Sequence, residues 1–72
     1  MPQRFHFDLT NEHTVVCDEK GVLADDLHEA IEEALEALRE MRISGDIDEL
    51  GYGWKMLIRD TEGVVRKILT VW

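Results

Sequence analysis

One stripe of apolar residues at helical spacing constrains the fold of this chain more than any other feature. From residue 27 onward, apolar side chains recur at i, i+3, i+4 and i+7, the spacing of one helix face. Either Asp25 or Asp26 can cap the first turn, with Asp26 at capping-box spacing from Glu29, and Gly45 can end the helix in the left-handed conformation. The pattern predicts an amphipathic helix at about residues 26–43, which must bury its stripe against a second layer. The stripe consists of Leu27, Ala30, Ile31, Ala34, Leu35, Leu38 and Met41.

Four shorter segments have the alternating pattern of strands. In the first, Phe5, Phe7 and Leu9 alternate with polar residues, so one face is apolar and the other polar. The length of 72 residues suits a single domain, residues 1–72. We therefore expect an α+β fold in the order strand-strand-helix-strand-strand, with the helix on one face of a mostly antiparallel, four-stranded sheet. The predicted strands lie at about residues 3–9, 13–17, 54–60 and 64–71.

Two Asp-x-x-Gly segments, Asp18–Gly21 and Asp60–Gly63, follow apolar runs. Neither has the alternating oxygen ligands of a calcium loop. Asp is favoured at the first position of a type I turn and Gly at the fourth, so both segments are predicted to be turns. We expect the first to direct the chain from the N-terminal hairpin into the helix, and the second to close the C-terminal hairpin. Asp46–Gly53 is predicted to be a loop, with Ile47 and Leu50 as candidate tethers to the core.

Composition restricts the classes of function. The chain has 8 Lys or Arg against 16 Asp or Glu, a net charge of −8. Nucleic-acid binding requires a basic surface, so we expect no nucleic-acid partner. No run approaches the ~20 apolar residues of a membrane span, and no export signal is evident, which predicts a cytoplasmic protein. One Cys and three dispersed His do not give a zinc-ligand spacing, so we expect no cofactor.

Three residues are weak candidates for chemistry. His6 and Asp8 project from the same face of the first strand, and a His–carboxylate pair can act as acid and base. The alternative is an exposed polar face, and whether it binds a small ligand is open. Cys17 could be a nucleophile, but a small half-buried thiol is the simpler interpretation. Because no complete catalytic constellation is present, we expect no enzyme, and a small enzyme using His6 and Asp8, or Cys17, is an alternative.

Two regions are candidate interfaces. The polar helix face is acidic, and it is either solvated or a docking surface for a basic partner. The last strand has apolar residues on both faces, including Ile68, and the chain ends in Trp72. We therefore expect a non-enzymatic protein-interaction or regulatory module that binds a protein partner or associates with itself as a homodimer. The acidic face includes Glu29, Glu33, Glu36 and Glu40.

The order of these motifs resembles a family of short bacterial proteins of unknown function. The matching segments are Arg4-Phe5-His6-Phe7-Asp8, the two Asp-x-x-Gly turns and the Ala-containing helix, so the resemblance covers nearly the whole chain. It implies no activity. The string Glu32–Leu38, "EEALEAL", is also similar to a helix of small antitoxin domains with a partial ribonuclease-H-like fold. That likeness implies an alternative role as an antitoxin-like regulator that neutralises a basic toxin.

Overall fold

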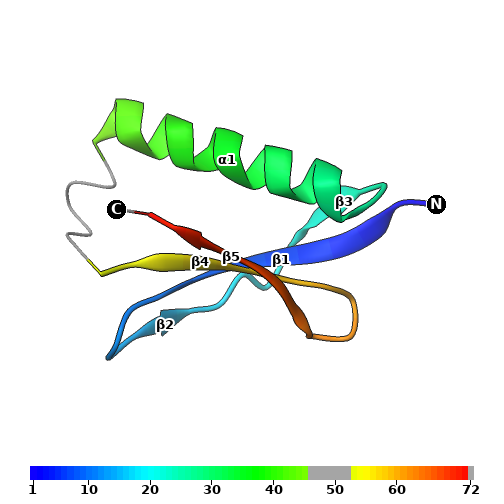
Figure 1. Cartoon of the computed structure of the whole chain (residues 1–72), viewed down its shortest axis with the longest axis horizontal. Helices are drawn as coiled ribbons and strands as arrows, with labels where there is room; N and C mark the ends of the chain where they lie inside the picture. Colours follow the sequence, from blue (N-terminus) through cyan, green and yellow to red (C-terminus); the bar gives the residue numbers. More distant parts are fainter. Residues whose placement is uncertain (46–52, 72) are drawn as a thin grey trace.

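The computed structural model of the chain describes residues 1–45 and 53–71. Within these residues, one helix lies across one face of an antiparallel sheet (Figure 1). The predicted α+β class is confirmed. The loop residues 46–52, with the candidate tethers Ile47 and Leu50, and the C-terminal Trp72 lie outside the described residues. The elements are β1 (Gln3–Thr10), β2 (Val15–Val16), β3 (Val22–Ala24), α1 (Leu27–Ser44), β4 (Lys55–Arg59) and β5 (Val65–Thr70).

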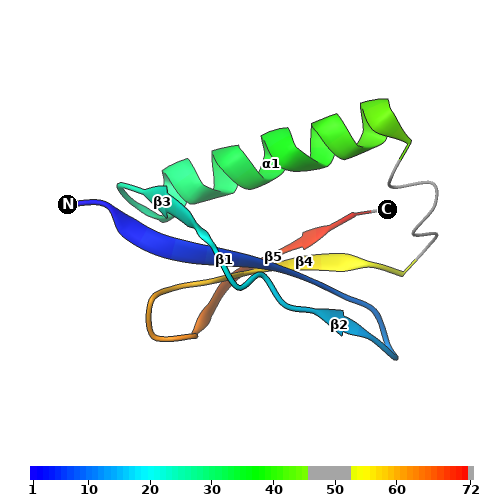
Figure 2. The same ribbon diagram turned by 180° about the vertical axis from the view of Figure 1, so that it is seen from behind.

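The sheet has five strands where the sequence predicted four. The strand order is β2-β1-β4-β5, and β3 also pairs with β1. β2 and β3 lie on the same side of β1, at opposite ends of it (Figure 2). They act as one edge strand that is interrupted by the first Asp-x-x-Gly segment. The predicted strand at 13–17 is therefore reduced to two residues, and the unpredicted β3 follows the interruption.

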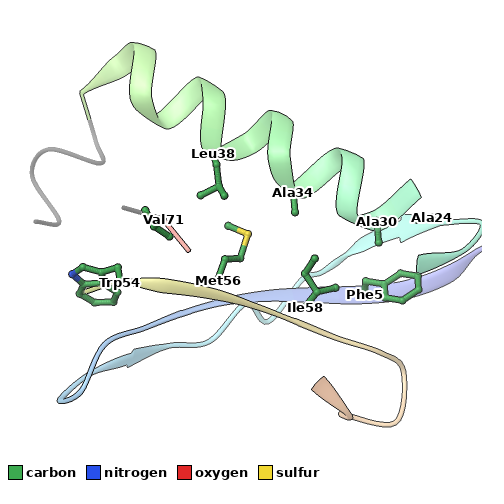
Figure 3. Packing of buried hydrophobic residues seen from close by; sticks show 9 residues of the cluster. All are labelled: Phe5, Ala24, Ala30, Ala34, Leu38, Trp54, Met56, Ile58 and Val71. Atoms are coloured by element: carbon green, nitrogen blue, oxygen red, sulfur yellow. The ribbon is translucent and has the colours of Figure 1, made fainter. Parts of the chain in front are cut away.

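The core forms between the inner face of α1 and the sheet (Figure 3). Ala30 and Ala34 are fully buried, and these small side chains let the helix pack closely on the sheet, where its nearest strand is β3. Trp54, directly before β4, is also buried. Leu35 is an exception to the predicted stripe, because it is 52% exposed. It is turned by about 100° from the buried Ala34, which places it at the margin of the stripe.

Both ends of α1 are capped as the sequence predicts. The Asp26 carboxylate accepts a hydrogen bond from the Glu29 backbone N–H at 2.9 Å, which satisfies one of the free donors of the first turn. Gly45 adopts φ 87° and donates its N–H to the Arg42 carbonyl at 3.3 Å. The helix bounds differ from the prediction by one residue at each end. Within the described part of the chain, no helix has the length and apolar character needed to cross a membrane.

The turn predicted at Asp60–Gly63 is confirmed. The Gly63 N–H donates to the Asp60 carbonyl at 3.0 Å, and the Asp60 side chain accepts from the N–H groups of Glu62 and Val64. Backbone donors bonded to the carboxylate, first that of Val64, lower the pKa of Asp60. This turn joins β4 to β5 and fixes which residues of the two strands lie opposite each other.

Candidate functional site

The face of the sheet that points away from α1, here called the open face, holds the candidate residues His6, Asp8 and Ile68. Alternate residues of a strand point to opposite faces, so Leu57 and Arg59 lie on the open face beside the buried Met56 and Ile58. Residues opposite one another in an antiparallel pair share a face. The register therefore adds His6, Asp8, Val65 and Ile68 to the open face.

Asp8 is the one buried charged residue in the described part of the chain, with 4% of its surface exposed. Arg59 donates from Nε to Asp8 Oδ2 at 2.5 Å and from Nη2 to Oδ1 at 3.1 Å. The backbone N–H of Asp18 adds a third bond to Oδ1 at 2.9 Å. Burial acts to raise the pKa of Asp8, but the Arg59 and Asp18 bonds outweigh it, so the pKa lies below its ordinary value.

Asp18 supports β1 where the edge strand is interrupted. Its carboxylate accepts from the Phe7 N–H at 3.1 Å and from the Gly21 N–H at 3.1 Å. The Phe7 donor would otherwise have lost its ladder partner, because neither β2 nor β3 pairs with that residue. Burial acts to raise the pKa of Asp18 too, but the backbone donors outweigh it and the pKa is lowered.

The first Asp-x-x-Gly segment therefore differs from its prediction. It does not lead directly into the helix but interrupts the edge strand and continues into β3. Gly21 has φ 71°, and a Cβ built there would lie 2.6 Å from the Phe5 carbonyl oxygen. Only glycine fits so close to the β1 backbone in this conformation. Asp18 contributes the hydrogen bonds of its carboxylate, and Gly21 allows the segment to lie close to the β1 backbone.

His6 and Asp8 share the open face as predicted, but they have different partners. His6 Nδ1 lies 2.7 Å from the Asp18 carbonyl oxygen. A neutral ring must carry its proton on Nδ1 to donate to that carbonyl. The Asp8 oxygens are taken up by Arg59 and Asp18. The geometry gives these groups one clear role, which is to fasten the Asp18 segment to β1 and β4.

Cys17 is exposed, so the interpretation as a half-buried thiol is wrong. The ladder between β2 and β1 ends at Val16, and Cys17 begins the interruption. Exposure by itself does not provide the neighbouring base that a catalytic thiol needs.

The β4–β5 half of the open face combines apolar and basic side chains. We call Leu57, Val65 and Ile68, together with Lys55 and Arg59, the sheet patch. Ile68 is 55% exposed and lies opposite Leu57, while Val65 is 43% exposed and lies opposite Arg59. A register shift between β4 and β5 places Val65 on this face, although Lys67, two residues on, lies opposite Ile58. Strict alternation along β5 would place Val65 and Lys67 on the same face.

The outer edge of β5 has features that discourage strand pairing. Arg66 and Lys67 occupy the strand, and the register shift falls beside them. Charged residues, lysine especially, and bulges are the usual means of blocking edge-to-edge association. The face of β5 is thus a better contact surface than its edge.

The outward face of α1 is a second surface with exposed apolar groups. Leu35 and Ile43 are 52% and 80% exposed, and Ile43 was not predicted to matter. Of the predicted acidic residues, Glu36 and Glu40 are exposed, whereas Glu29 and Glu33 are half-buried on the flank of the helix. A shallow hollow of about 500 Å³ on this face is lined by Glu32, Leu35, Glu36, Arg39, Glu40 and Ile43.

A larger hollow of about 580 Å³ adjoins the turn between β1 and β2. Two of its polar side chains serve the turn: Asn11 Oδ1 accepts from the N–H groups of His13 and Thr14 at 2.8 and 2.7 Å, and the Thr10 hydroxyl donates to the Thr14 carbonyl at 3.0 Å. Among residues 1–45 and 53–71, no three His, Cys, Asp or Glu side chains are grouped to hold a metal ion.

Charge is segregated between the two layers. The helix α1 contains five Glu and two Arg, a net charge of −3. The five strands contain five Lys or Arg and one Asp, a net charge of +4. A chain with an overall charge of −8 therefore has a basic sheet. These cations do not all share a face, because Lys55 and Arg59 lie on the open face whereas Lys67 lies opposite the buried Ile58.

Comparison with known proteins supports the resemblance seen in the sequence. Comparisons with curated proteins and with solved structures gave no match. A family model described as a domain of unknown function (DUF6894) matches residues 4–70, which is nearly the whole chain. The resemblance to an uncharacterised family is confirmed, whereas the antitoxin likeness is not among the matches. The chain belongs to the DUF6894 family of domains of unknown function.

Proposed function

We propose that this protein is a non-enzymatic protein-binding module and that the sheet patch is its binding surface. The observation that carries the proposal is the cross-strand pair of Leu57 and Ile68, which leaves apolar surface exposed on the open face beside Lys55 and the Arg59–Asp8 ion pair. Exposed apolar groups that are adjacent to one another and rimmed by charge are typical of protein-interaction sites.

The energetics fit a contact of modest strength. Fully burying an Ile side chain stabilises by roughly 1.5–3 kcal/mol, so covering the exposed half of Ile68 contributes about 1 kcal/mol. A standard interface covers about 800 Å² per partner, which needs more than three apolar residues. The surrounding charges must therefore take part, and they contribute mainly to orientation and specificity.

The hydrogen bonds that Asp8 makes to Arg59 and Asp18 favour a binding role over catalysis. Catalysis at Asp8 would require a carboxylate that is available to a substrate proton. Its oxygens instead accept from Arg59 and from the Asp18 N–H, and its surface is almost fully covered. A structural function accounts for each of these bonds.

An antitoxin-like role is a second candidate, and it uses the other layer. The exposed Glu36 and Glu40 on α1 would face the basic surface of a toxin. Co-expression with a candidate toxin tests it, with Glu36→Lys/Glu40→Lys as the control. Rescue of growth by the native chain and not by the control supports this role, and the absence of rescue removes it for that toxin.

Capture experiments test the leading proposal. The native chain, Ile68→Glu and Leu23→Glu are immobilised and exposed to an extract of the source cells. Ile68 and Leu23 are both 55% exposed, and Leu23 lies on β3, outside the sheet patch, so the two variants are matched. We expect the native chain and Leu23→Glu to retain the same protein, and Ile68→Glu to lose it. Equal retention by all three would refute the proposal.

A further inference from the structure

We propose that the sheet patch binds the outward face of α1 in a second copy of this chain. The helix patch consists of Leu35 and Ile43 with Glu32, Glu36 and Glu40. This inference rests on the proposed function above and names the partner of that surface. The two patches lie on opposite sides of the molecule, because α1 covers one face of the sheet and the sheet patch lies on the other (Figure 1).

The apolar groups of the two patches are complementary in kind and exposure. The sheet patch presents Ile68 at 55% and Val65 at 43% exposure. The helix patch presents Leu35 at 52% and Ile43 at 80%. The shallow hollow beside Leu35 and Ile43 is open to solvent, so both side chains are accessible to a partner surface. Contact between the patches would cover the exposed apolar groups of both.

The charges favour contact between unlike patches over contact between like ones. Two sheet patches face to face would oppose Lys55 to another lysine, since Arg59 is already paired with Asp8. Two helix patches would oppose glutamates to glutamates. A sheet patch against a helix patch instead brings cations to the acidic rim, with Arg39 as the one cation among the residues lining the hollow. Arg59 uses Nε and Nη2 for Asp8, which leaves Nη1 donors for a partner carboxylate.

Such a contact is head-to-tail. Each copy uses one surface to bind and offers a different surface to the next copy, so the assembly extends beyond a pair unless it closes as a ring. A symmetric homodimer would instead need like surfaces to meet. The charged, shifted edge of β5 also disfavours the alternative in which two sheets join edge to edge.

Neutral substitutions make the test independent of net charge. Ile68→Thr removes apolar surface from the sheet patch and keeps a β-branched strand residue. Leu35→Gln does the same to the helix patch with a good helix former. Leu23→Thr is the matched control on β3. Sedimentation velocity over a concentration series gives the dissociation constant, and circular dichroism verifies that each variant is folded.

We expect the native chain and Leu23→Thr to self-associate equally, and each patch variant to do so about tenfold more weakly. An equimolar mixture of Ile68→Thr and Leu35→Gln should form a 1:1 pair with the native dissociation constant. In that mixture the intact sheet patch of one variant meets the intact helix patch of the other. The pair should not grow further, because its two remaining surfaces are both altered.

Two results would overturn the inference. A native chain that stays monomeric over the whole concentration series removes it. Self-association without recovery in the mixture would indicate a symmetric contact and removes it as well. Salt dependence is a poor substitute, because salt screens the attraction between patches and also the repulsion between chains of charge −8. If the native chain is monomeric but Ile68→Glu still loses a captured protein, the proposed function stands and only the identity of the partner changes.

Discussion

Two glycines in equivalent motifs should respond very differently to the same substitution. Gly21 and Gly63 both end an Asp-x-x-Gly segment and have φ values of 71° and 84°. A Cβ at Gly21 would lie 2.6 Å from the Phe5 carbonyl oxygen and 2.9 Å from Arg4 Cγ. A Cβ at Gly63 has no other atom within 4 Å. Replacing each by Ala therefore separates the cost of the backbone conformation from the cost of steric overlap.

The magnitudes follow from these surroundings. Holding Ala in the left-handed conformation costs about 1–2 kcal/mol, and this should be the whole effect of Gly63→Ala. Gly21→Ala adds overlap with a backbone oxygen, which cannot rotate away as a side chain can. Overpacking of this kind typically costs about 1–3 kcal/mol, so the total for Gly21→Ala is about 2–5 kcal/mol. Since 1 kcal/mol shifts the Tm of a domain this small by roughly 4–8 °C, the two variants should differ by roughly 10 °C.

Urea unfolding followed by circular dichroism measures both variants against the native chain. We expect a lower midpoint for Gly21→Ala than for Gly63→Ala, with the dependence on urea concentration unchanged in both, because the native compactness is the same. Equal midpoints for the two variants would refute the close packing of the Asp18 segment against β1. A larger loss of stability for Gly63→Ala than for Gly21→Ala would refute the assignment of Asp60–Gly63 as a turn with free space around Gly63.

Three further predictions concern carboxylates. Asp8→Asn should lower the free energy of unfolding by about 1–3 kcal/mol, because the charged bonds to Arg59 are lost inside the sheet; an unchanged urea midpoint would contradict this. The pKa values of Asp8 and Asp18 are lowered in the folded chain, so their stabilisation is present above about pH 4 and is lost as the pH falls through the folded pKa values. Over this pH range, the free energy of unfolding should fall less steeply with decreasing pH for Asp8→Asn than for the native chain. Equal slopes for the two would contradict the argument. Asp26→Ala should cost about 1 kcal/mol of helix capping, measured by thermal unfolding, whereas Asp25→Ala should have little effect; equal losses would disprove the cap.

The parts of the fold that depend on local signals were predictable. The helix was expected at 26–43 and is found at Leu27–Ser44, because its cap, its stripe and its terminal glycine are all within reach of one another along the chain. The Asp60 turn was predictable for the same reason. In each case, the residues that determine the helix or the turn lie within it or a few sequence positions away.

The parts that depend on distant segments were not predictable. β3 has three residues, which is too short for a periodic pattern, and it exists because Gln3–Phe5 offers a partner strand. The use of the Asp18 carboxylate by the Phe7 N–H also requires knowledge of which strands are neighbours. Likewise, the register shift beside Arg66 places Val65 on the open face, and alternation along the sequence gives no sign of it.

The candidate interface shows why the overall charge was an incomplete guide to partners. A net charge of −8 favours a basic partner if the charge is spread evenly, but the strands carry +4 and the helix −3. A partner contacts one face at a time, and salt largely screens charges that lie more than about 10 Å away. In the sheet patch, Lys55 attracts acidic groups while Arg59 is paired with Asp8, and the helix patch attracts basic groups, although the two patches belong to one chain. This segregation makes a second copy of the chain a complementary partner, which the composition alone would have argued against.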